Sequence, residues 1–134
     1  MNLISIRFIT DDVQKLAEFY QKVIGIKATF YTKDFAELKF ATATLAIGST
    51  KTLAFFGGNE TLTAAQNRSA IIEFQVADVD KSYADMAAFL KETIIQKPTT
   101  MPWGNRSLLF CDPDGNVINF FTPVTSEAMQ KFAR

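Results

Sequence analysis

Residues 8–15 read Phe-Ile-Thr-Asp-Asp-Val-Gln-Lys, and residues 74–81 read Phe-Gln-Val-Ala-Asp-Val-Asp-Lys. Phe, Asp, Val and Lys recur at the same offsets in the two stretches, and each stretch leads into a segment with apolar residues at helical spacing. A unit of this size that is repeated once indicates two similar modules that bury their apolar faces together. The chain therefore encodes one fold unit twice.

The first copy begins with a strand and a helix. Residues 3–9 alternate between two faces, one of them uniformly apolar, which is typical of a strand. Asp11 or Asp12 can cap the helix that follows, because a short carboxylate accepts hydrogen bonds from free backbone N–H groups. Gly25 ends this helix. Its apolar stripe consists of Val13, Leu16, Phe19, Tyr20 and Val23.

Three more strands complete each copy, so that the order is β-α-β-β-β. In the first copy they are expected at about 26–32, 35–47 and 51–57, the second bent near residues 41–44. The second copy has a strand at 69–76 and a helix at about 78–91, striped by Val79, Met86, Ala87 and Leu90. Its later strands lie at about 93–97, 106–111 and 116–122, and the stretch Asp-Pro-Asp-Gly at 112–115 predicts a turn between the last two.

These elements predict a single α+β domain over residues 1–134. Module one covers 1–58, a linker 59–68, module two 69–124 and a C-terminal helix 125–134. The 13 phenylalanines can fill the core or line a pocket or an interface, and the core reading is favoured.

Composition excludes several kinds of partner. The 14 basic and 14 acidic residues give a net charge of zero and form no basic run, so no nucleic-acid partner is expected. No apolar stretch approaches the length of a membrane span, and no secretion signal is visible. The single cysteine, Cys111, cannot form an internal disulfide, which fits a cytoplasmic protein.

The two-module plan resembles the vicinal oxygen chelate superfamily, which includes glyoxalase I, extradiol dioxygenases and bleomycin resistance proteins. The most specific match is Pro-Trp-Gly-Asn-Arg at 102–106 followed by Phe-Cys-Asp-Pro-Asp-Gly-Asn at 110–116, which is similar to the family's C-terminal hairpin. The resemblance covers nearly the whole chain. It implies two βαβββ modules that form a concave mixed sheet with the helices outside.

The resemblance also implies where metal ligands would lie, on the first and last strand of each module. The matching positions here are Ser5 and Ala54 in module one and Ile71 and Asn119 in module two. The chain has no histidine, Ala and Ile cannot ligate, and Ser and Asn are poor ligands for transition metals. These residue types therefore predict neither a metal nor another cofactor.

Without a metal, a sheet surface remains that can bind a small molecule. The alternation directs Ser5 and Arg7 into it from the first strand and Glu73 from the fifth. Arg7 can hold a ligand carboxylate or phosphate, or it can form an ion pair with Glu73. The predicted ligand-binding residues are Ser5, Arg7, Phe56, Glu73, Trp103, Arg106, Asn119 and Phe121.

For each of these residues a structural role competes with the binding role. Trp103 can stack on a flat ligand or cover the core, and Arg106 can contact a ligand or pair with Asp112 or Asp114. Tyr31, Phe35 and Phe40 could add aromatic walls, but their faces cannot be assigned from the pattern. No Ser-His or Cys-His arrangement exists, so no catalytic residue is predicted.

Three functions follow from these patterns. The favoured one is a metal-free binding protein of the bleomycin-resistance type for a small aromatic or amphipathic molecule. The others are a metal-dependent lyase or dioxygenase, and a metal-free isomerase or lyase that uses Glu73 or Asn119. Because relatives of this fold commonly pair, a homodimer is expected.

Overall fold

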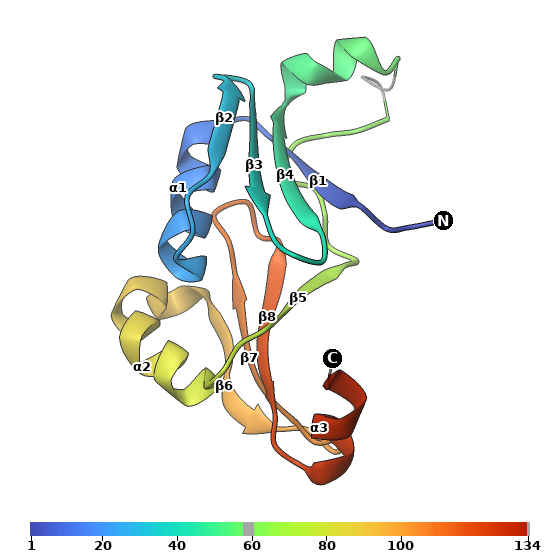
Figure 1. The fold of residues 1–134 in the computed structure, drawn as a ribbon. Helices are drawn as coiled ribbons and strands as arrows, with labels where there is room; N and C mark the ends of the chain where they lie inside the picture. Colours follow the sequence, from blue (N-terminus) through green and yellow to red (C-terminus); the bar gives the residue numbers. More distant parts are fainter. Residues whose placement is uncertain (58–60, 134) are drawn as a thin grey trace. The chain divides into compact units, whose positions relative to one another are not determined.

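The computed structural model describes residues 1–57 and 61–133 (Figure 1). They divide into two compact units. The first comprises the described residues of Met1–Asn67 with Pro113–Gly115, and the second those of Arg68–Asp112 with Asn116–Arg134. The expected linker at 59–68 is described only from residue 61 onward.

The first unit contains one four-stranded mixed sheet in the order β1-β4-β3-β2. Parallel pairing joins β1 to β4, and antiparallel pairing joins β4 to β3 and β3 to β2. The elements are β1 Ser5–Thr10, α1 Val13–Ile24, β2 Thr29–Thr32, β3 Phe35–Lys39, β4 Thr44–Ser49 and the 3-10 helix η1 Thr50–Phe55.

Helix α1 forms where the sequence predicts it. The Asp12 carboxylate caps it by accepting from the backbone N–H of Lys15 at 3.0 Å, so Asp12 and not Asp11 is the cap. Gly25 ends the helix with a φ of +83°, a conformation that glycine adopts without steric cost. All five predicted stripe residues are buried, and the ring of Tyr20 packs between Phe8 and Phe19. The helix therefore covers one face of the first sheet.

The second unit repeats this topology with the order β5-β8-β7-β6. Parallel pairing joins β5 to β8, and the remaining pairs are antiparallel. The elements are β5 Ile71–Gln75, α2 Val79–Leu90, the short 3-10 helix η2 Lys91–Thr93, β6 Ile94–Thr100, β7 Asn105–Cys111, β8 Val117–Pro123 and α3 Ser126–Phe132. The predicted βαβββ repeat and its α+β class are thus confirmed.

Helix α2 packs on one face of the second sheet. Asp78 caps it as Asp12 caps α1, by accepting from the N–H of Lys81 at 3.1 Å. The Thr122 hydroxyl accepts from the backbone N–H of Val79 and donates to the carbonyl of Val76, which ties β8 to the start of the helix. The buried sheet side chains beneath the helix are Leu108, Phe110, Ile118 and Phe120.

Helix α3 lies on the other side of this sheet (Figure 1). Its Phe132 ring packs 5.0 Å from Phe121, which lies on the opposite face of β8 from Phe120. Gly104, with a φ of +92°, makes room for this helix: a Cβ there would lie 2.1 Å from Thr125 Oγ1 and 3.1 Å from Ala128 Cβ. The close approach requires glycine at this position.

The turn between β7 and β8 forms as predicted. Asp112 accepts from the backbone N–H and the side-chain amide of Asn116 at 2.9 and 2.8 Å, and Gly115 has a φ of +81°. The Asp112 carboxylate is therefore used inside the turn.

Two expectations for the first unit are wrong. The strand expected at 35–47 is two strands, β3 and β4, joined by a turn in which Phe40 N–H donates to the carbonyl of Ala43. The segment expected as a strand at 51–57 is η1, because Ser49 caps it and the Thr52 hydroxyl donates back to the carbonyl of Ser49. Ile4 and Ile6, which belong to the expected apolar face of residues 3–9, are exposed.

Candidate functional site

Each sheet has one face under a long helix, α1 or α2, and a second face that carries polar side chains, part of which α3 covers in the second unit. On this second face, which we call the open face, the first sheet places Arg7 beside Ala46 and Ala46 beside Glu37. The second sheet places Glu73 beside Asn119 and Asn119 beside Leu109. The repeat therefore puts Arg7 and Glu73 at equivalent positions of their two units.

The predicted ion pair between these two residues stays a prediction, because Arg7 belongs to the first unit and Glu73 to the second. Within its own unit, each has a different partner. Arg7 contacts two aromatic rings, and Glu73 accepts a hydrogen bond from Asn119.

The Glu73–Asn119 pair is the strongest polar feature of the second open face. The Asn119 amide donates to Glu73 Oε2 at 2.8 Å. Asn119 is only 7% exposed, and its Oδ1 atom has no hydrogen-bond partner among the described residues. Buried amide oxygens normally accept a hydrogen bond, so this atom is a ready acceptor for a donor group.

The surroundings of Asn119 mix polar and aromatic side chains. Ser107 is buried on the neighbouring strand β7, where it pairs in register with Phe121. Phe121 lies on the same face of β8 as Asn119, as the alternation predicts, but Phe132 of α3 packs against it. This contact could not be predicted, since no local pattern indicates which face a C-terminal helix covers.

Arg7 extends across the first open face between β1 and β3. Its guanidinium carbon lies 4.8 Å from the ring centroid of Phe35 and 5.1 Å from that of Phe56, distances typical of cation–π contacts. Phe56 was expected at the end of a strand and instead follows η1. Ser5 is exposed on the same face, two residues before Arg7.

Arg106 is held by a residue that the sequence did not indicate. Its Nε and NH2 groups donate to Oδ2 and Oδ1 of Asp80 at 2.8 and 3.1 Å, and its NH1 group donates to Thr100 at 3.3 Å. This contact lowers the pKa of Asp80, first through the hydrogen bonds and then through the charge of the guanidinium. The expected partners Asp112 and Asp114 are therefore wrong, and three of the five N–H donors of Arg106 are used by Asp80 and Thr100.

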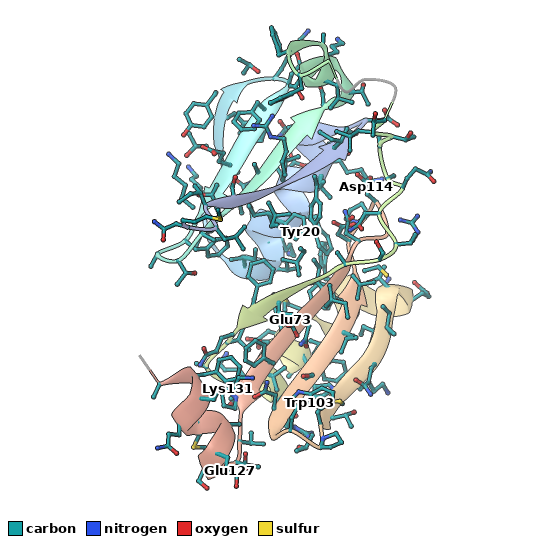
Figure 2. The ribbon with its side chains drawn as sticks, turned by 90° about the vertical axis from the view of Figure 1, so that its right-hand side faces the viewer. Tyr20, Glu73, Trp103, Asp114, Glu127 and Lys131 are labelled. Atoms are coloured by element: carbon teal, nitrogen blue, oxygen red, sulfur yellow. The ribbon has the colours of Figure 1, made fainter. Side chains whose placement is uncertain are left out.

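Trp103 lies in the turn between β6 and β7, as Figure 2 shows, and is 67% exposed. Trp103 and Glu73, which Figure 2 shows on β5, lie at different levels of the sheet. Asn105, two residues after Trp103, pairs with Pro123 of β8, whereas Glu73 pairs with Asn119, four residues earlier on the same strand. A core-covering role does not fit this exposure. A stacking role stays a prediction.

The donor set at the implied ligand positions does not fit a transition metal. Ser5, Ile71 and Asn119 lie on β1, β5 and β8 as expected, but Ala54 lies in η1 and not on a strand. The last strand of the first unit is β4, and its open-face residue beside Arg7 is Ala46, which has no donor atom. In the described part of the chain no cluster of three or more His, Cys, Asp or Glu side chains could hold an ion.

The chain contains two units with the same βαβββ topology, and comparison with known proteins agrees with this fold. The model of the glyoxalase/bleomycin resistance protein/dioxygenase superfamily matches residues 2–120. The chain belongs to this superfamily.

Individual relatives agree with this assignment. The Bacillus subtilis protein YraH is 27% identical over 125 residues, which cover 90% of this chain and 98% of YraH. A glyoxalase/bleomycin resistance protein/dioxygenase family enzyme from Burkholderia phytofirmans has a similar structure, with a TM-score of 0.79, 18% identity and coverage of 92% of this chain and 100% of its own. A similarly titled protein from Nocardioides has a TM-score of 0.77 and 18% identity, with coverage of 94% and 85%. These structural matches establish the fold.

None of the helices within residues 1–57 and 61–133 is long and apolar enough to cross a membrane.

Proposed function

We propose that this protein binds a small, aromatic or amphipathic molecule without a metal ion, as the bleomycin resistance proteins of its superfamily name suggest. The single observation that carries the proposal is the buried Asn119 amide, which has a free acceptor atom beside a carboxylate. A ligand N–H or O–H group directed at Asn119 Oδ1 would satisfy it, and Glu73 would accept a second donor. Ser107 and Phe121 supply further polar and aromatic contacts on the same face.

The metal-free part of the proposal is supported by the chemistry of the side chains. Strong ligands for zinc, iron or nickel are histidine, thiolate and carboxylate. The four strand positions discussed above hold Ser5, Ala46, Ile71 and Asn119 instead. No step of the proposed function therefore involves a metal.

The test combines elemental analysis with calorimetric titration of a library of small aromatic compounds, with and without a chelator. We expect less than stoichiometric transition metal and binding that the chelator leaves unchanged. Asn119→Leu should weaken the best compound by about tenfold, the effect of one buried hydrogen bond to an otherwise unpaired acceptor. Gln66→Leu, which removes an exposed amide in the first unit, outside the second sheet, is the matched control. Stoichiometric metal, or binding that chelation abolishes, would overturn the proposal.

A second candidate is a metal-free isomerase or lyase, and it rests on the orientation of Glu73. A carboxylate held by an amide at 2.8 Å is positioned to remove a proton from a bound molecule. The test is exchange of ligand C–H hydrogen for deuterium in heavy water. Exchange that Glu73→Gln abolishes, with binding retained, would favour this candidate over simple binding.

The proposal includes a homodimer in the cytoplasm. The apolar side chains of Leu3 and Ile4, which precede β1, and of Ile6 on β1 are exposed, which supports a further contact surface. Light scattering of the purified protein tests the oligomeric state, and a monomer at micromolar concentration would contradict the dimer.

A further inference from the structure

The open face of the first sheet holds a cation among aromatic rings. Arg7 lies within cation–π distance of Phe35 and Phe56, which come from β3 and from the segment after η1. Phe56 is 66% exposed although it contacts Arg7. An exposed phenylalanine beside an exposed arginine forms a surface that water solvates poorly and a flat molecule can cover.

Small residues on β4 explain why these side chains lie flat. Gly48 pairs with Ile9 on one side and Phe35 on the other, and Ala46 pairs with Arg7. A Cβ at Gly48 would lie 3.4 Å from Arg7 Cδ and 3.8 Å from Phe35 Cδ1. The absence of larger side chains on β4 lets the arginine stem and the phenylalanine ring lie over this strand.

The N–H groups of Arg7 are not used inside its unit. Among the described residues of that unit, Arg7 forms no hydrogen bond and no ion pair. The acidic residue on the same face, Glu37, lies 3.9 Å from Lys39. Cation–π contacts engage the flat face of a guanidinium, whereas carboxylates bind at its N–H edge. The edge therefore remains able to bind an anion.

An aromatic wall continues from this cation. The rings of Tyr31 and Phe35 stack with centroids 5.9 Å apart and planes inclined by 28°. Tyr31 is half-exposed, and Lys39 Nζ lies 5.4 Å from its centroid. A planar ring can stack along this wall while its substituent reaches Arg7.

From these contacts we propose that the first open face binds a planar aromatic carboxylate, with the anion on the N–H edge of Arg7 and the ring against Phe35 and Tyr31. A monoanion fits better than a phosphate dianion, because Arg7 is the one cation of the face that Glu37 does not contact in the described residues. The inference rests on the proposed function and adds to it a chemical class and a second set of contacts.

The test measures binding of 2-naphthoate, the neutral 2-naphthamide and 2-naphthyl phosphate to the full chain by calorimetry. We expect naphthoate to bind at least about tenfold more tightly than the amide and the phosphate, a difference of about 1.4 kcal/mol. Arg7→Gln should abolish the preference for naphthoate and leave amide binding unchanged. Phe56→Leu should weaken the binding of naphthoate and of the amide by about threefold to tenfold, because it removes an aromatic ring from this face but keeps the charge of Arg7.

Two controls make the result specific. Lys15→Gln changes an exposed cation on α1 and should leave all three affinities unchanged. Gly48→Ala would place a Cβ 3.0 Å from Thr52 Oγ1 but only in ordinary contact, at 3.4 Å, with Arg7 Cδ, so it should leave the preference for naphthoate over the amide intact. Thermal unfolding of each variant confirms that it is folded.

The inference is overturned if naphthoate and the amide bind equally, if the preference survives Arg7→Gln, or if the phosphate binds best. It is also overturned if only the Glu73→Gln variant prefers naphthoate over the amide. In that case the carboxylate of Glu73, and not a ligand, would bind the N–H edge of Arg7 in the original protein. In each of these cases, neutral aromatic binding that depends on Asn119 would leave the proposed function standing. Absence of any aromatic binding would instead remove the proposed function.

Discussion

Arg106 on β7 binds Asp80 in the first turn of α2 through two nearly parallel hydrogen bonds, Nε to Oδ2 at 2.8 Å and NH2 to Oδ1 at 3.1 Å. This geometry joins the helix to a strand that is 26 residues away in sequence. A bidentate pair of this kind fixes orientation as well as distance. It therefore belongs to the framework of the second unit and not to its open face.

Asp80→Asn should destabilise the protein slightly at neutral pH and less in acid. Arg106 lowers the pKa of Asp80 in the folded state, so the ionised pair stabilises the fold above the ordinary aspartate pKa of about 4. This stabilisation is lost as the pH falls through the lowered folded-state pKa. Urea unfolding of both proteins at pH 7 and pH 2.5 measures the difference.

The matched control for this experiment is Asp85→Asn, which removes an exposed pair with Lys81 within α2. Such a pair contributes little, so this variant should lie closer to the original protein at pH 7. A difference for Asp80→Asn that stays constant with pH would contradict the role of its charge.

Gly104→Ala should destabilise the second unit more than Gly25→Ala destabilises the first. Both positions have positive φ, which costs other residues about 1–2 kcal/mol. A Cβ at Gly25 meets nothing within 4 Å, whereas a Cβ at Gly104 would overlap the Thr125 side chain. We expect a loss of about 1 kcal/mol for Gly25→Ala and about 3 kcal/mol or more for Gly104→Ala.

Hydrogen exchange distinguishes how the strain at Gly104 is relieved. If α3 moves away, the amides of Ala128 and Met129 exchange faster in Gly104→Ala but not in Gly25→Ala. Equal stabilities for the two variants would show that α3 does not approach Gly104 closely.

Asn119→Asp should destabilise the protein by about 3 kcal/mol at pH 7, because it buries a carboxylate at position 119 beside the exposed carboxylate of Glu73. Burial and the neighbouring negative charge raise the pKa of the new carboxyl. The lost stability should therefore return as the pH falls below this raised value. Asn119→Leu, which introduces no charge, should change stability little and without pH dependence.

Phe110→Ala should lower the free energy of unfolding much more than Phe56→Ala, because Phe110 is buried in the core and Phe56 is exposed. Phe110 is fully buried and packs edge-to-face against Phe120 at 5.1 Å, so truncation should cost about 3–5 kcal/mol. Phe56 is mostly exposed, and its truncation should change the free energy of unfolding by less than about 0.5 kcal/mol. Chemical denaturation measures both, and a large effect at Phe56 would mean that it supports the fold.

The elements that could be predicted from the sequence are those whose signals are local. The stripe of α1, its Asp12 cap and Gly25 end, and the turn at 112–115 depend only on neighbouring residues. The segment after Ser49 is a 3-10 helix and not the predicted strand, although its Thr, Leu and Phe content also suits a strand. The side-chain bonds of Ser49 and Thr52 to the backbone favour the 3-10 helix instead.

The turn between β3 and β4 contains neither glycine nor proline, and for this reason the alternation of residues 35–47 could not show where the strand ends.

Site residues could be predicted where strand alternation alone decides their face. Asn119 and Glu73 lie together because β5 and β8 pair in register, and Arg7 lies on the expected face. The partners of Arg7 and Arg106 could not be predicted, because Phe56 depends on the chain path after η1 and Asp80 lies on a separate element.

The equivalent strand position holds a cation in one copy of the βαβββ unit and an anion in the other. Internal duplication thus lets the same strand position carry a different charge in each half, with different partners within its own unit: two aromatic rings for Arg7 and an amide for Glu73. Descendants of one ancestral gene could in this way acquire new binding preferences stepwise, half by half, while the shared architecture is inherited unchanged.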